Sequence, residues 1–260
     1  MITIWISRKK WYVWISMDLL LIILFYTLLI MANSSISWMI NTENENAGKT
    51  AYPTYDRASR NDLYRLEMES TMVHNRLVLS DLDSVYLLCN LADSAASIEL
   101  EGLPLHQGKV LSAYISPVIK ELNKEALLQW LSKPMVSVSE ISTLEKQPVY
   151  LRRAPRDTTE AALQKEEHVT VENFAGFLLQ FDNGLILQIR QSDNAGFRQA
   201  WQEVRFNIDI FSTHRLSAIL QAITFREPEY HPSIILEMDR QDVIILYRAM
   251  PAKVSAALVL

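Results

Sequence analysis

The chain has little cysteine and little glycine, and both shortages exclude classes of protein. Cys89 is the only cysteine among 260 residues, so no disulfide can form within the chain. Its neighbours from Val85 to Leu91 are mostly apolar, which predicts a buried structural thiol. The six glycines form neither common phosphate-binding loop, and no Gly-x-Ser-x-Gly motif occurs. The sequence therefore indicates neither a nucleotide-binding loop nor a serine hydrolase of that type.

Clustered metal ligands and positive charge are also scarce. The histidines stand singly and do not have the spacing of a metal site: His74, His106, His168, His214 and His231. The chain has a net charge of −5, and because residues 1–32 carry +2, residues 33–260 carry −7. An acidic domain argues against binding nucleic acid or anionic lipid by charge. We therefore expect no metal, no cofactor and no nucleic-acid partner.

The N-terminal region contains the longest apolar run. The basic cluster Arg8, Lys9 and Lys10 precedes 22 almost entirely apolar residues, 11–32, and no Lys or Arg follows until Lys49. As a helix this run would extend about 33 Å, enough to cross a bilayer core of about 30 Å. The position of the basic cluster places residues 1–10 in the cytoplasm and the remainder across the membrane. The sequence thus predicts a single-pass membrane protein with a periplasmic or other extracytoplasmic domain.

A cleaved signal peptide is the alternative interpretation of residues 11–32. The run is longer than the apolar region of a typical signal peptide, and it ends without a clear small-x-small cleavage pattern. In addition, Trp11, Tyr12 and Trp14 occupy positions suited to an aromatic belt at the membrane interface. These features favour a retained anchor. Asp18, the single charge in the run, lies within reach of the basic end or contacts another membrane subunit.

Residues 33–80 are predicted to connect the membrane to the exported domain. Residues 33–55 are rich in Asn, Ser, Glu and Thr and are predicted to be a linker. Residues 56–80 are predicted to form a stalk-like helix with a seam of positions three and four apart, at Leu63, Leu66, Ser70, Val73 and Leu77, of which all but Ser70 are apolar. This seam either packs on its own domain or binds a partner helix.

Residues 81–260 are predicted to be a β-rich domain, giving the chain an α+β, mainly β fold class. The hairpin around Asp182-Asn183-Gly184 is the clearest signal, because Asn-Gly favours a tight turn between two apolar strands. Further strands are predicted within 85–91, 98–105, 110–115, 203–211, 233–237 and 254–260. Helices are predicted at 117–132, about 157–167 and 241–249, whereas 215–225 fits either structure.

Two segments, about 85–102 and 232–260, together resemble the ends of an L,D-transpeptidase catalytic domain. The first resembles the opening strand-turn-strand of that fold, with the residues Val85–Leu91 and Ser97–Gly102. The second resembles its closing helix, proline and strand, with Asp242, Leu246, Tyr247, Pro251 and Val254–Leu260. The resemblance implies a cell-wall cross-linking fold in which a cysteine thiolate acts on a peptide carbonyl.

The catalytic motif of that family is missing. Its pattern is Ser/Thr-His-Gly-Cys, and the nearest match is Ser212-Thr213-His214-Arg215-Leu216, which lacks both the glycine and the cysteine. No catalytic residue is therefore predicted. We expect a non-catalytic envelope protein, an accessory or scaffold subunit that binds membrane lipid and another envelope protein or a cell-wall component. The alternative is a cell-wall peptide transferase or hydrolase with an unconventional site.

Overall fold

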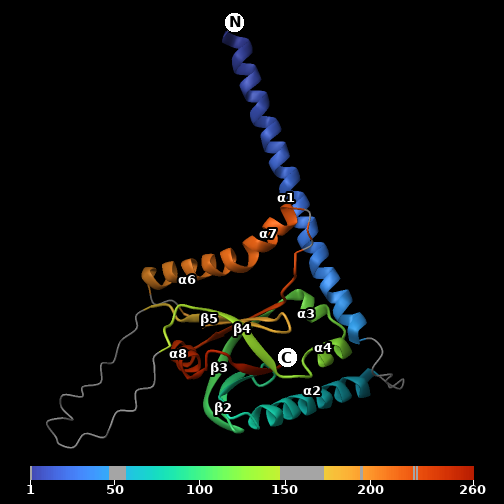
Figure 1. The fold of residues 1–260 in the computed structure, drawn as a ribbon, viewed down its shortest axis with the longest axis vertical. Coiled ribbons are helices and arrows are strands. Elements are labelled where there is room, and N and C mark those ends of the chain that lie inside the picture. Colours follow the sequence, from blue (N-terminus) through green and yellow to red (C-terminus); the bar gives the residue numbers. More distant parts are fainter. Residues whose placement is uncertain (1, 47–56, 147–172, 194–195, 225, 227) are drawn as a thin grey trace, which may run out of the picture.

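A computed structural model describes the chain except for residues 1, 47–56, 147–172, 194–195, 225 and 227. It contains a long N-terminal helix, α1, and a mainly β domain in which eight strands close into a barrel (Figure 1). The α+β class predicted from the sequence is confirmed at this level. The predicted helix at about 157–167 lies outside the described residues.

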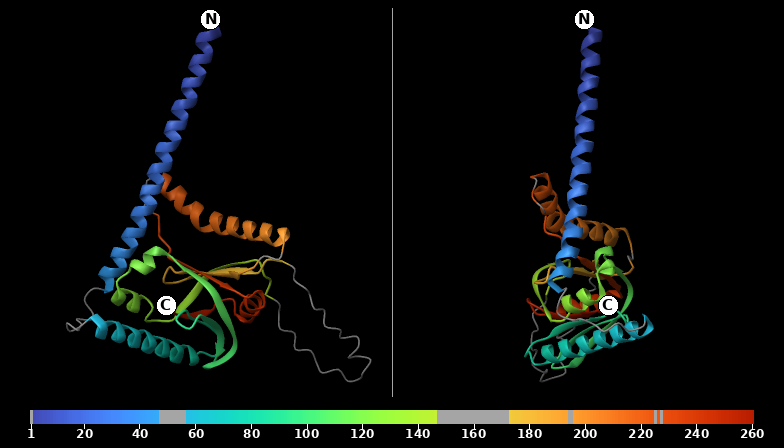
Figure 2. Two further views of the ribbon diagram at one scale, coloured as in Figure 1. Left: turned by 180° about the vertical axis from the view of Figure 1, so that it is seen from behind. Right: turned by 90° about the vertical axis from the view of Figure 1, so that its right-hand side faces the viewer.

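Helix α1 (Ile2–Asn46) is much longer than a membrane requires. Its 45 residues extend about 67 Å. Among the described residues, the segment Ser16–Asn44 is long and apolar enough to cross a membrane, a property that an anchor and a signal sequence share. The N-terminal half of the helix projects beyond the barrel, and its C-terminal end lies against the barrel (Figure 1, Figure 2).

The C-terminal part of α1 corrects the predicted linker. Residues 33–46 continue the helix, because Ser34, Trp38 and Thr42, spaced four apart, face the domain. Ser34 and Thr42 are buried, and Trp38 packs against the main apolar core. Tertiary contacts on one face therefore stabilise a helix that the polar composition obscures. Residues 47–55 of the predicted linker lie outside the described residues.

Helix α2 (Arg57–Ser80) confirms the predicted helix but packs with a different face from the predicted seam. Its buried positions are Met68, Asn75 and Leu79, whereas Leu66, Val73 and Leu77 are exposed. The Asn75 side-chain amide donates a hydrogen bond of 2.9 Å to the carbonyl of Leu131. The side chains of Met68, Asn75 and Leu79 thus attach α2 to the domain, and Leu66, Val73 and Leu77 of the predicted seam face outward.

The first half of the barrel is an antiparallel meander. Strands β1 (Tyr86–Asn90), β2 (Ala95–Leu100) and β3 (Leu103–Ile115) pair in order, and a turn with positive φ at Glu101 and Gly102 joins the last two. Strand β3 is long enough to pair with β2 along its first half and with β7 along its second. It therefore connects the two halves of the barrel.

Two short helices separate the halves. The single helix predicted at 117–132 is in fact α3 (Pro117–Glu121) and α4 (Lys124–Trp130), because the Asn123 side chain caps α4 at its own N-terminus. Strand β4 (Met135–Ser142) follows. The apolar residues of both helices enter the main core, so they close one end of the barrel: Ile119, Leu122, Ala126, Leu127 and Leu131.

The predicted hairpin is confirmed as β5 (Gly176–Phe181) and β6 (Ile186–Gln191). Gly184, at φ +83°, provides the left-handed residue of the turn, and its N–H bonds to the carbonyl of Phe181 at 3.0 Å. The predicted strands at 233–237 and 254–260 are β7 (Ser233–Met238) and β8 (Ser255–Val259). Parallel pairing of β8 with β1 closes the barrel.

Helix α8 (Arg240–Ala249) confirms the predicted helix at 241–249 and contacts β2, β3, β5 and β6. Its Val243, Leu246 and Tyr247 belong to the main core. Gly108 on β3 permits this packing, because a Cβ there would lie 2.8 Å from the Cβ of Asp242. The neighbouring His106 Nε2 lies 2.9 Å from Asp242 Oδ1, so a His–Asp pair also joins strand and helix.

The strand predicted at 203–211 is wrong. The segment belongs to helix α6 (Phe197–Ile210), followed by a π-helical turn, η1 (Phe211–Arg215), and α7 (Leu216–Ile223). The four alternating apolar residues form two pairs whose members lie four positions apart, as on one side of a helix. Phe206 and Ile210 face inward, and Val204 and Ile208 face outward. A short alternation of apolar and polar residues fits both the two-residue period of a strand and the 3.6-residue period of a helix. The packing of Phe206 on β5 and β6 favours the helix.

Candidate functional site

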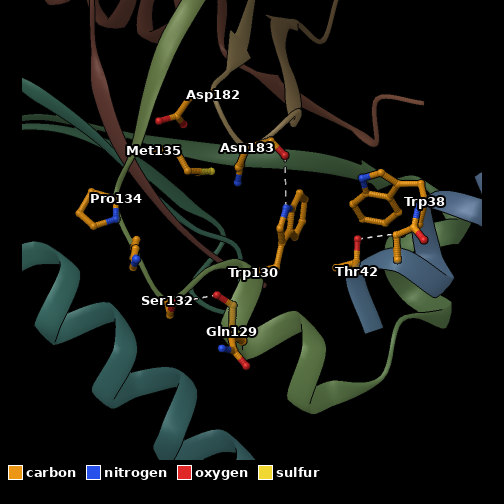
Figure 3. Close-up of a pocket in the computed structure, with 11 residues that line it drawn as sticks. Trp38, Thr42, Gln129, Trp130, Ser132, Pro134, Met135, Asp182 and Asn183 are labelled. Atoms are coloured by element: carbon orange, nitrogen blue, oxygen red, sulfur yellow. Dashed lines mark hydrogen bonds between the residues drawn. The ribbon is translucent and has the colours of Figure 1, made fainter. Parts of the chain in front are cut away.

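A groove lies where α1, α4, β4 and the β5–β6 turn meet. Two adjoining cavities of about 610 and 550 Å³ form it, and both are lined by Trp38, Asn41, Asp182 and Asn183. Figure 3 shows the first cavity, with the hairpin residues Asp182 and Asn183 across from Gln129 and Ser132. The groove therefore depends on four parts of the chain that are far apart in the sequence: residues 34–42, 129–138, 180–184 and 228–231.

Aromatic rings form the centre of the groove. The Trp38 ring lies edge-on to the Trp130 ring at 5.4 Å and tilted to the Tyr230 ring at 6.0 Å, measured between centroids. The indole N–H of Trp130 donates to the carbonyl of Asn183 at 3.4 Å (Figure 3). These contacts hold α1, α4 and the hairpin together, and leave amphipathic ring surfaces beside the cavities.

Polar groups surround the rings. The Asp182 carboxylate accepts the N–H of Val136 at 3.1 Å, and Asn183 Oδ1 accepts the N–H of Leu185 at 3.1 Å. The Asn183 Nδ2 and His231 Nδ1 atoms are buried without a hydrogen-bond partner among the described residues. Such unpaired buried atoms cost free energy, and a bound polar ligand can satisfy them.

The comparisons with known proteins add no assignment. No family model, curated protein or solved structure matches this chain. The chemistry of the groove must therefore be derived from its own residues. Rings flanked by amides, hydroxyls and a carboxylate can bind a ligand that has both polar groups and apolar faces. Within the part of the chain that the structure describes, no group of three His, Cys, Asp or Glu residues could hold a metal ion.

The only thiol is unsuited to nucleophilic catalysis. Cys89 is 1% exposed in β1, among the apolar core residues Leu87, Ala96 and Leu258. Burial raises the pKa of this thiol to about 12. Almost none of it is therefore thiolate at neutral pH, whereas thiol nucleophiles require the thiolate. The predicted buried thiol is confirmed.

The pH dependence of stability should report this burial. Cys89 has a folded pKa of about 12 against a reference of 9.0, so between these values the unfolded chain binds fewer protons. The free energy of unfolding should then fall as pH rises, by about 1.5 kcal/mol more than in Cys89→Ala between pH ~9 and ~10.5. Denaturant titration of both proteins at the two pH values measures this difference. If the free energy of unfolding changed equally with pH in both proteins, and a thiol reagent labelled the folded protein rapidly, the burial of Cys89 would be contradicted.

The sequence-predicted site residues are not gathered at one place. Arg8, Lys9, Lys10, Trp11, Tyr12 and Trp14 lie on α1, but their side chains lie outside the described part. Asp18 is exposed on the same helix, and Leu63 on α2 is half-buried beside the exposed seam. The match to the nucleophile motif, residues 212–216, lies across η1 and the start of α7, so these residues form a helical segment.

Sequence reasoning missed the residues of the groove. Trp38 stood in the predicted linker, Trp130 near the end of a predicted helix, and Asn183 in a turn. A large aromatic residue is unusual in a solvated linker, and Trp38 was the one signal of tertiary packing there. The His106–Asp242 pair was also missed, because its members are separated by 136 positions in the sequence.

Proposed function

We propose that this protein is a membrane-anchored, non-catalytic accessory protein of the cell envelope, and that the groove at Trp38 binds a cell-wall component or another envelope protein. The proposal rests on the groove, because its polar groups converge on an aromatic centre, as in a ligand site. Glycan strands and peptides both present hydroxyl or amide groups beside apolar faces, which suits this lining.

The N-terminal helix supplies the membrane part of the proposal. Residues 11–32 span the bilayer, the basic cluster Arg8 to Lys10 stays in the cytoplasm, and the barrel is periplasmic or otherwise extracytoplasmic. The helix continues without a break into the groove-forming segment of α1. Such a rigid connection holds the groove at a fixed height above the membrane. The exposed residues Leu66, Val73 and Leu77 on α2 remain available to a partner subunit.

A variant that fills the groove tests the proposal. Asn41 is exposed on α1 and lines both cavities, so Asn41→Trp should block the groove without disturbing the core. Ile40→Trp places the same side chain at a neighbouring exposed position that does not line the cavities. We expect wild type and Ile40→Trp, purified in mild detergent, to retain partners or isolated cell walls, and Asn41→Trp to lose at least tenfold of that binding. Equal binding by all three proteins would contradict the proposal that the groove is the binding site.

The alternative function, a cell-wall peptide transferase or hydrolase, predicts a different outcome. The full chain incubated with muropeptides should yield no cross-linked or cleaved product by mass analysis, since Cys89 is buried and protonated. Turnover that disappears in Cys89→Ala would instead establish the enzyme.

A further inference from the structure

Helices α6 and α7 expose an unusual amount of apolar surface. Eight large apolar side chains along the two helices and the turn between them are exposed: Phe197, Trp201, Val204, Ile208, Phe211, Leu216, Leu220 and Ile223. Phe197 is 86% exposed and Trp201 is 63% exposed. We refer to these eight residues as the apolar stripe. Contiguous surface of this kind marks an interaction site, because isolated domains rarely leave it in water.

The apolar stripe lies on the side of α6 opposite the barrel. Counting about 100° per residue from the buried Phe206, the stripe positions of α6 and Phe211 fall about 140–220° away. The inward side is partly polar and is attached by specific hydrogen bonds. Gln202 Oε1 accepts the N–H of Phe174 at 2.8 Å, and Glu203 pairs with Arg190 at 3.1 Å. A surface helix on a water-soluble domain ordinarily has the reverse arrangement, with its most apolar side inward.

The π-helical turn keeps the stripe continuous. In η1 the N–H of Leu216 bonds to the carbonyl of Phe211, five residues earlier, so the turn accommodates about one extra residue. That extra residue rotates α7 by about 100° relative to an uninterrupted α-helix. The rotation brings Leu216, Leu220 and Ile223 into line with the stripe of α6 and turns the buried Ala222 toward the domain. Without it, the apolar residues of α7 would leave the stripe.

The position of α7 relative to α1 identifies what covers the stripe. Helix α7 contacts α1, and Leu28, Met31 and Ala32 of α1 line one cavity together with Ala218 of α7. These α1 residues are the last of the predicted membrane span, so α7 meets α1 at the level where the chain leaves the bilayer. Figure 1 and Figure 2 show α6 and α7 running crosswise to α1, on the side of the barrel from which its N-terminal half projects.

We infer that α6 and α7 form an interfacial membrane helix, whose apolar stripe inserts among the lipids of the bilayer that α1 crosses. This inference rests on the membrane anchoring proposed above. An amphipathic helix in the interface plane buries its apolar side at the boundary of headgroups and acyl chains. Exposed Arg205 and Ser212 lie on the flank of the stripe, where headgroups would contact them. With α1 as one attachment and α6–α7 as a second, the barrel keeps one orientation on the membrane.

Spin labels on the full chain in phosphatidylcholine–phosphatidylglycerol vesicles test the inference. In a Cys89→Ala background, single cysteines replace Val204, Ile208, Leu21 on α1 and, as the control, Leu103 on β3. All four original side chains are exposed, so the labels disturb no core packing. Nitroxides at Val204→Cys and Ile208→Cys should be relaxed several-fold more by oxygen than by a polar nickel chelate, relative to Leu103→Cys. Leu21→Cys should report the lipid interior.

Each other outcome would overturn the inference in a recognisable way. If Leu21→Cys contacts lipid while Val204→Cys and Ile208→Cys behave like Leu103→Cys, the anchor stands and the interfacial helix does not. If both stripe labels are shielded from oxygen and nickel alike, a protein surface covers the stripe. If Leu21→Cys contacts water, the membrane anchor itself fails, and the inference fails with it.

Discussion

Replacing Leu187 with alanine should lower the free energy of unfolding by about 2–5 kcal/mol, because it opens a cavity in the centre of the barrel. Leu187 is 2% exposed on β6, and its neighbours across the sheet are Leu179 on β5 and Ile234 on β7. All three side chains belong to the main core, so none can move to fill the space without disturbing the others.

The control for this prediction is Leu103→Ala. Leu103 lies on β3 and is 69% exposed, so the same change of side chain should alter the free energy of unfolding by no more than about 0.5 kcal/mol. Denaturant titration of the full chain in detergent, followed by tryptophan fluorescence, compares the two variants. Similar losses would show that residues 177–191 do not form the core hairpin of the barrel.

The hairpin could be predicted from the sequence because its determinants are local. Two apolar runs and the turn Asp182-Asn183-Gly184 stand within 15 residues, and the turn residues specify the conformation whatever surrounds them. Helix α8 and strand β8 were predicted from equally local signals, the helix from the Pro251 that follows its end and the strand from its apolar run. Closure of the barrel by parallel pairing of β8 with β1 could not be predicted, because it joins segments about 170 residues apart.

Helix α6 could not be predicted because its environment decides its structure. Val204, Phe206, Ile208 and Ile210 alternate as in a strand, and a strand would place all four on one apolar side. The structure instead uses both sides of a helix, with the barrel on one and the proposed membrane surface on the other. When a segment has apolar residues on two sides, its secondary structure can be predicted only if the surfaces that contact each side are known.

The groove was missed for a related reason. Its side chains come from α1, from α4 and the start of β4, from the hairpin and from residues 228–231, and these four parts of the chain are far apart in the sequence. The region around Trp38 is polar in composition, so the helical spacing of Ser34, Trp38 and Thr42 was not recognised. Apart from the large aromatic side chain of Trp38, only contact with the barrel distinguishes these three residues from a solvated linker.

A buried ionic network attaches α2 to the barrel, and its loss should have the second large effect. Arg76 on α2 donates to Glu99 Oε2 at 2.8 Å and to the carbonyl of Gly102 at 3.0 Å, while the Tyr86 hydroxyl donates to the same carboxylate oxygen at 2.9 Å. Glu99 is 3% exposed. The hydrogen bond to Glu99 raises the pKa of Arg76, and burial raises the pKa of Tyr86.

The variant Arg76→Ala should lower the free energy of unfolding by about 2–3 kcal/mol. It leaves the buried Glu99 carboxylate without its cation, which costs more than losing an exposed ion pair. The Arg76 side chain is 41% exposed, so water already screens part of its attraction to Glu99. The expected loss is therefore smaller than for a fully buried ion pair. Arg65→Ala is the matched control on the same helix, since its pair with Glu69 is exposed on both sides and should contribute less than about 0.5 kcal/mol.

The double variant Arg76→Ala, Glu99→Gln separates the loss of charge pairing from a general weakening of α2. Neutralising Glu99 removes the unpaired buried charge, so the double variant should be more stable than Arg76→Ala alone. Denaturant titration of the wild type, both single variants and the double variant gives the coupling free energy directly. If Arg76→Ala and Arg65→Ala were equally stable, the Arg76–Glu99 pair would not contribute to the attachment of α2, and apolar packing together with Asn75 would hold the helix.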